Sequence, residues 1–123
     1  MNPLFRAALV AAGMAAAAMV QAQNFPSQSV RMIVPFPPGG TTDILARDVA
    51  AQLSTRWNVA VVVDNKGGAS GTIGSEQLVR SAPDGYTLMV TATHHVINPS
   101  LMKKLPYDTK RDFTPIAQIA LVP

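Results

Sequence analysis

The sequence has no cysteine, little charge and few aromatic side chains, and each shortage argues against a class of protein. Without cysteine there is no disulfide framework, no thiol nucleophile and no cysteine-based zinc site. Charged residues make up 14% of the 123 positions, and the formal net charge is +3. The basic residues are scattered and form no face with interleaved aromatic side chains, so we expect no nucleic-acid partner.

Long apolar runs are also scarce, and the clearest one lies at the N-terminus. Ala7 to Val20 is uncharged and rich in alanine, and it follows a short, weakly positive start. This run of about 14 residues is too short to span a membrane, which needs about 20. Val20-Gln21-Ala22 then offers a cleavage site, so we expect residues 1–22 to be a secretory signal peptide and residues 23–123 to form one small domain.

The remaining chain alternates apolar strands with helical segments. Short apolar runs predict strands at 30–34, 59–63, 86–91 and 116–122, with one helix after the first run and a second over 72–81. Residues 93–104 are predicted to form a loop with one helical turn at 99–102. Helices between hydrophobic strands indicate an α/β fold with a parallel, helix-covered sheet.

The first predicted helix has a clear apolar stripe. Leu45, Val49, Leu53 and Trp57 recur at i+4 spacing, and the stripe is widened by Ile44, Ala46 and Ala50. Either Thr41 or Thr42 is expected to cap this helix, with Asp43 in its first turn. In the second helix, Ile73 and Leu78 are the candidates to face inward.

Three loops follow the carboxyl ends of the predicted strands, where ligands bind in open α/β sheets. They are residues 36–43, 65–72 and 91–98, and all are rich in small or hydroxyl-bearing residues. The first two open onto helix N-termini, whose free N–H groups and dipole favour anions. Prolines stiffen the first loop, and glycines allow a ligand to approach the backbone. The alternative is that these are ordinary tight turns between strand and helix.

The candidate ligand-binding residues come from all three loops. They are Phe36, Pro38, Gly39, Gly40, Thr41, Thr42 and Asp43 in the first, Gly68, Ala69, Ser70, Gly71 and Thr72 in the second, and Thr93, His95 and Asn98 in the third. Asp43 has two possible roles, one as a first-turn helix charge and one in contacting the ligand or ordering the loop.

Enzymatic motifs do not fit the spacing. Gly68, Gly71 and Gly74 read G-x-x-G-x-x-G after the second strand, whereas a dinucleotide site needs G-x-G-x-x-G after the first. A nucleophile elbow around Ser70 would need glycine at position 72. No H-E-x-x-H or acidic cluster accompanies the histidine pair, so we expect no metal and no cofactor. An exported hydrolase using Ser70 and His95 stays open as the enzymatic alternative.

Five motifs in this order resemble the Bug family, the periplasmic solute-binding proteins of tripartite tricarboxylate transporters. They are VRMIVPFPPGGTTDILAR, VVVDNKGGASGTIGSE, APDGYTLMV, HHVINPSLMKKLPYD and RDFTPIAQIA, and the resemblance covers residues 25–122. It implies the first domain of a two-domain, Venus-flytrap periplasmic-binding-protein fold. By this resemblance the chain would be truncated, with the second domain absent.

The resemblance also implies a function. Family members capture small carboxylates without catalysis and deliver them to the membrane components of the transporter, and such receptors are usually monomers. The carboxylate is held largely by backbone groups and ordered waters from the loops that match residues 36–43 and 68–72. A module that presents its ligand to a membrane sensor kinase, and a truncated product with no function of its own, remain as alternatives.

The second loop departs from the family pattern. Family members often read N-R-P-G-A-G-G-N-I-G, whereas this chain reads N-K-G-G-A-S-G-T-I-G. Gly67 in place of proline predicts a more flexible loop, and Ser70 and Thr72 are expected to alter the ligand contacts.

Overall fold

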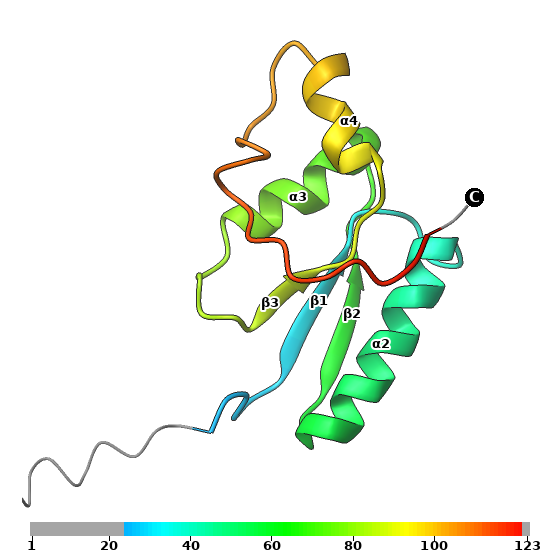
Figure 1. Ribbon diagram of the computed structural model, residues 1–123, viewed down its shortest axis with the longest axis vertical. Helices are drawn as coiled ribbons and strands as arrows, with labels where there is room; N and C mark the ends of the chain where they lie inside the picture. The colour runs from blue at the N-terminus through cyan, green and yellow to red at the C-terminus, as the bar shows by residue number, and fades with distance from the viewer. Residues whose placement is uncertain (1–23, 122–123) are drawn as a thin grey trace, which may run out of the picture.

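A small parallel sheet with helices around it forms the centre of the molecule (Figure 1). The computed structural model describes residues 24–121, so the expected signal peptide lies outside the described residues. In chain order the elements are β1 (Val30–Val34), α2 (Thr41–Trp57), β2 (Val61–Asn65), the 3-10 turn η1 (Ala69–Gly71), α3 (Thr72–Val79), β3 (Thr87–Met89) and α4 (His94–Leu101). The predicted parallel α/β architecture is confirmed.

Strand β1 is the central strand, and its sequence explains why. The sheet order is β2-β1-β3, with Val30 opposite Val61 and Met32 opposite Leu88. Four of its five residues are buried, which suits the continuous apolar run of a strand covered on both faces. Met32 and Val34 pack against Ala46 and Ala50 of α2, whose small side chains let the helix lie close to the sheet.

Most of the apolar positions predicted for helix α2 face the core, but not all of them do. Val49 and Leu53 pack against the core, whereas Ile44 is 61% exposed and its predicted inward position is wrong. The core line of the helix instead runs through Asp43, Ala46 and Ala50, so Ile44 is turned to solvent. Neither threonine caps the helix, because Gly40 is the N-cap residue and no side chain hydrogen-bonds there.

The second half of the described chain differs from the predictions in several boundaries. Strand β2 begins and ends two residues later than expected, α3 ends at Val79, and β3 keeps only three residues. Residues 94–101 form the full helix α4 where a loop with one turn was expected. Ile73 is 51% exposed because the buried face of α3 runs through Thr72, Gly74 and Ser75, so its predicted inward position is wrong.

The predicted fourth strand is absent from residues 116–121. This segment crosses in front of the sheet as irregular chain, with Ile116 80% exposed and Leu121 84% exposed (Figure 1). An apolar run becomes a strand only where its backbone pairs with a neighbouring strand, and among residues 24–121 the sheet consists of β2, β1 and β3, so this segment pairs with neither outer strand. Within the same residues no helix has the length and apolar character needed to cross a membrane.

Candidate functional site

The three predicted loops meet at the carboxyl edge of the sheet (Figure 1). The first and second are joined by the side-chain amide of Asn65, which donates to the carbonyl oxygen of Phe36 at 3.1 Å. The third reaches both of the others. The ring of His94 lies 5.5 Å from that of Phe36, and the amide of Asn98 donates to the carbonyl oxygen of Ser70 at 2.9 Å.

The first loop delivers an uncapped helix N-terminus to this edge. Gly39 turns the chain at φ +87°, and the carbonyl oxygen of Gly40 accepts the first helical hydrogen bond, from Ile44 at 3.0 Å. The N–H groups of Gly40, Thr41 and Thr42 come before that bond, so the helix supplies no acceptor for them. With no capping side chain in place, these N–H groups and the positive end of the helix dipole can bind an anion.

The Asp43 carboxylate orders this loop from inside. It is 2% exposed and accepts hydrogen bonds from the Gly39 N–H at 2.8 Å, Asn65 Nδ2 at 2.9 Å and Arg47 Nε at 3.0 Å. These donors, Arg47 first, lower the pKa of Asp43 from 3.8 to about 2. Of the two roles left open by the sequence, the contacts match loop ordering.

The second loop has four consecutive residues with positive φ, from Gly68 at +123° to Gly71 at +83°. Ala69 and Ser70, at +47° and +54°, are the unusual pair, because side chains disfavour this region. Such backbone persists where surrounding contacts hold it, and it is frequent at ligand clamps. The run places an exposed Ser70 at the edge and starts α3 from Gly71 without a capping side chain.

Some predicted contact residues instead serve the fold of these loops. The Thr72 hydroxyl is buried and donates to the carbonyl oxygen of Ala69 at 2.9 Å. Asn98 is 3% exposed and anchors α4 to the second loop through the Ser70 carbonyl. Thr93 is exposed just before α4, so its hydroxyl remains accessible from solvent.

His95 points away from the other two loops. Its ring stacks 6.1 Å from Tyr107 and lies edge-on to Phe113 at 4.5 Å, and burial lowers the pKa of His95. Among the hydrogen bonds of residues 24–121, none joins the hydroxyl of Ser70 to His95. The hydrolase alternative therefore gains no nucleophile–base pair from this arrangement.

Three residues at this edge were not among the candidate ligand-binding residues, namely Arg47, Asn65 and His94, although Asn65 and His94 lie within the predicted loops. Arg47 follows Asp43 at i+4, a spacing that favours ion pairs on a helix. Asn65 is the last residue of β2, at the strand end where polar side chains meet in a parallel sheet. For His94 the sequence carries no such signal, because only the placement of α4 brings it onto Phe36.

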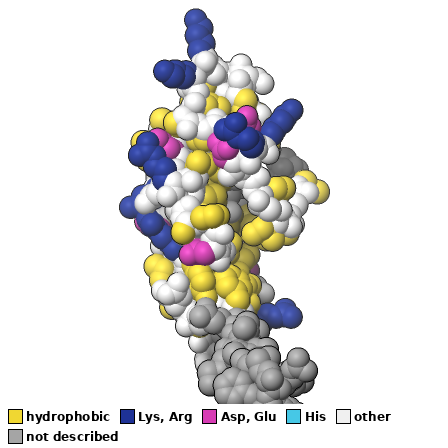
Figure 2. Space-filling view, turned by 90° about the vertical axis from the view of Figure 1, so that its left-hand side faces the viewer, with side chains coloured by type: hydrophobic (Ala, Val, Ile, Leu, Met, Phe, Trp, Pro, Cys, Tyr) yellow, Lys and Arg dark blue, Asp and Glu magenta, His cyan; other side chains and the backbone are white. Residues whose placement is uncertain are grey.

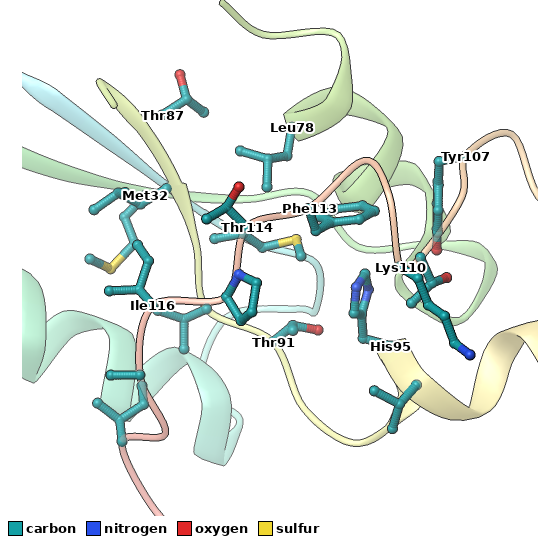
Figure 3. Close-up of a pocket in the computed structure, with 18 of the residues that line it drawn as sticks. Met32, Leu78, Thr87, Thr91, His95, Tyr107, Lys110, Phe113, Thr114 and Ile116 are labelled. Carbon is teal, nitrogen blue, oxygen red and sulfur yellow. The ribbon is translucent and has the colours of Figure 1, made fainter. Parts of the chain in front are cut away.

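A separate apolar cavity of about 1110 Å³ lies beside β3 (Figure 3). Met32 of β1, Leu88 of β3 and Val90 just after β3 line it on one side, and Ile116 and Ile119 line it from the irregular segment. His95, Tyr107 and Phe113 lie together at one side of it. The cavity takes no residue from the first or second loop, but it shares Thr91, His95 and Val96 with the third.

The surface chemistry of the described chain gives two further observations. On the face that Figure 2 shows, Lys and Arg side chains stand apart and are interspersed with acidic and apolar ones. Nowhere in residues 24–121 do three or more metal-binding side chains gather into a possible ion site.

Comparisons with known proteins point to one family. Residues 45–123 match the family described as tripartite tricarboxylate transporter family receptor. Protein BugT of Bordetella pertussis is 41% identical over 109 residues, which are 87% of this chain and 33% of that protein. The chain spans about a third of the length of the curated relatives that it matches.

Solved structures agree with this match. The structure of the periplasmic binding protein BugD is 48% identical, with a TM-score of 0.51, and covers 53% of this chain and 22% of its own. MatC from Rhodopseudomonas palustris, solved with bound malate, is 35% identical, with a TM-score of 0.68, and covers 74% of this chain and 31% of its own.

Proposed function

Because this chain belongs to the tripartite tricarboxylate transporter receptor family, we propose that it binds a small carboxylate at the carboxyl edge of its sheet. The observation that carries the proposal is the uncapped N-terminus of α2, where Gly40, Thr41 and Thr42 offer N–H groups without helical acceptors. The second loop adds the exposed residues Ala69 and Ser70 at the same edge, whereas the first N–H groups of α3 are already used, since Gly71 donates to the Gly68 carbonyl oxygen at 3.0 Å and Thr72 to that of Ala69.

This arrangement suits reversible binding better than chemistry. Each helix N-terminus contributes roughly 0.3–2 kcal/mol to anion binding, with hydrogen bonds added to that. A receptor must release its ligand, so a site built from backbone donors with moderate affinity is appropriate. We therefore assign a binding role without catalysis.

The wider setting follows from the relatives. MatC was solved with malate, which makes a dicarboxylate the first ligand class to test. With an N-terminal segment of signal-peptide layout and a periplasmic relative in BugD, we place the mature protein in the periplasm. Its partners would be the membrane components of a tripartite tricarboxylate transporter, to which it would deliver its ligand as a monomer.

A thermal-unfolding scan of the full chain, with and without malate and a panel of other mono-, di- and tricarboxylates, tests the proposal. A ligand present at 100 times its dissociation constant adds about 2.7 kcal/mol of stability. For a domain of this size we expect the melting temperature to rise by roughly 10 °C or more. A cooperative transition that no carboxylate shifts would contradict the proposal.

Gly40→Val tests where the carboxylate binds. The structure leaves room for the new side chain, since the nearest atom to an added Cβ is the Pro37 carbonyl oxygen at 3.9 Å, and φ is an ordinary −78°. We expect the variant to fold but to lose at least tenfold in malate affinity by calorimetry, because the side chain blocks approach to the N–H groups. Ala51→Val, on the exposed face of the same helix, should bind malate as the wild type does.

A further inference from the structure

We propose that Asp43, Arg47 and Asn65 form a positioning cluster that holds the first loop in the shape that receives the carboxylate. This inference rests on the proposed function and assigns residues that support the site without touching the ligand.

The hydrogen bonds of the cluster close on themselves. Arg47 Nε donates to Asp43 Oδ2 at 3.0 Å, and Arg47 Nη2 donates to Asn65 Oδ1 at 3.0 Å. Asn65 Nδ2 completes the ring by donating to Asp43 Oδ1 at 2.9 Å. Each side chain is therefore fixed by the other two, which limits the rotamers that any of them can adopt.

The cluster holds the loop at two points on either side of its turn. Asn65 Nδ2 also reaches the Phe36 carbonyl oxygen at 3.1 Å, and Asp43 Oδ2 accepts from the Gly39 N–H at 2.8 Å. Between these points lie Pro37 and Pro38, whose φ angles are already restricted. The turn is thus tied to β2 through Asn65 and to α2 through Asp43.

The cluster also neutralises the negative charge of Asp43 near the site. A carboxylate in the first turn of a helix is stabilised by the dipole, but its negative charge would also repel an incoming carboxylate. Arg47 neutralises it at hydrogen-bond distance, and its own side chain remains 53% exposed. Because Asp43 occupies the Gly39 N–H, the N–H groups left for a ligand are those of Gly40, Thr41, Thr42 and Asp43 itself.

Pre-organisation is the expected benefit. A loop that must be ordered when the ligand arrives lowers the affinity by the cost of that ordering. Breaking the cluster should therefore weaken binding and loosen the loop together, even though none of its three side chains contacts the ligand.

The experiment compares cluster variants in two measurements, malate affinity by calorimetry and amide hydrogen exchange at Gly39. In Asn65→Asp two carboxylates face each other, and we expect at least a tenfold loss of affinity and at least tenfold faster exchange at Gly39. Arg47→Gln changes a side chain that is 53% exposed, so the fold should tolerate it. We expect a smaller loss of malate affinity and a smaller rise in the exchange rate at Gly39. Gln118→Glu adds the same negative charge on the exposed irregular segment and should change neither.

A double variant separates positioning from general damage. Asp43→Asn with Asn65→Asp again sets an amide against a carboxylate, so we expect it to bind malate at least threefold more tightly than Asn65→Asp alone. Two unrelated structural lesions would instead add and make the double variant the weakest.

Each outcome bears on a different claim. Malate binding that survives in all cluster variants, or unchanged exchange at Gly39 in Asn65→Asp, would overturn the positioning role while leaving the proposed function intact. A wild-type chain that binds neither malate nor any other carboxylate of the panel would overturn the proposed function, and the positioning role with it.

Discussion

At the edge of the sheet, the packing of the chain depends on one small residue, Gly74, and on one buried charge, Asp43. Gly74 lies where α3 meets the end of β1, and an added Cβ would come within 2.8 Å of Pro35 Cβ and 2.9 Å of the Lys66 carbonyl oxygen. Backbone cannot yield as a flexible side chain can, so glycine is needed there for close packing. Asp43 is the opposite case, a charged side chain buried because three donors surround it.

Gly74→Ala should lower the free energy of unfolding by about 1–3 kcal/mol, because it forces two packed segments apart. Urea denaturation of both proteins measures the difference. Gly40→Ala is the matched comparison, since it adds the same methyl group in open space and loses less than about 1 kcal/mol through a weaker N-cap. Equal losses in the two variants would contradict the packing argument.

Asp43 also predicts how stability depends on pH. Its pKa is about 2 in the folded chain and 3.8 when unperturbed, so the unfolded state takes up a proton first as pH falls. The stabilisation is complete above about pH 4 and is lost as pH falls towards 2. The difference in unfolding free energy between wild type and Asp43→Asn should shrink over this interval. A difference that stays constant would contradict the stabilising role of the Asp43 carboxylate.

Among the elements, α4 depends most on a single anchor. Only Asn98 of this helix is buried, and its amide donates to the Ser70 carbonyl oxygen in the second loop. On the solvent side Val96 and Leu101 are 68% and 75% exposed. The helix is thus held by polar contact and by the rings of His94 and His95 rather than by a broad apolar face.

Asn98→Ala should release this helix from the second loop. We expect a loss of about 1–3 kcal/mol in the free energy of unfolding, because the Ser70 carbonyl loses its partner. Amide hydrogen exchange should speed up across α4 while β1 stays protected. Ser100→Ala, an exposed position on the same helix, should leave the exchange unchanged.

At the scale of the whole molecule, the described chain leaves apolar surface uncovered beside β3. The cavity of about 1110 Å³ is lined mainly by aliphatic side chains, and it is bounded by an irregular segment rather than a strand or helix. An apolar space of this size can admit a hydrophobic dye without unfolding of the core.

We expect the native chain to enhance the fluorescence of anilinonaphthalene sulfonate through this cavity. Ile116→Glu places a charge in the cavity lining and should reduce the enhancement at least threefold. Ile73→Glu changes an exposed isoleucine that does not line the cavity, so it should have little effect. A similar reduction in both variants would show that the dye binds elsewhere.

The sequence by itself determined the α/β class, the strand at 30–34, the helix that follows it and the juxtaposition of the three loops. Periodicity and turn residues carry that information because each depends on neighbours in the chain. The tertiary structure decided what depends on distant partners. It left residues 116–121 irregular, because this segment pairs with neither outer strand of the sheet, and it gave Asp43 its donors from Asn65 and Arg47. It also turned His95 towards Tyr107 and Phe113, because a side chain's direction follows from packing rather than from its place in a motif.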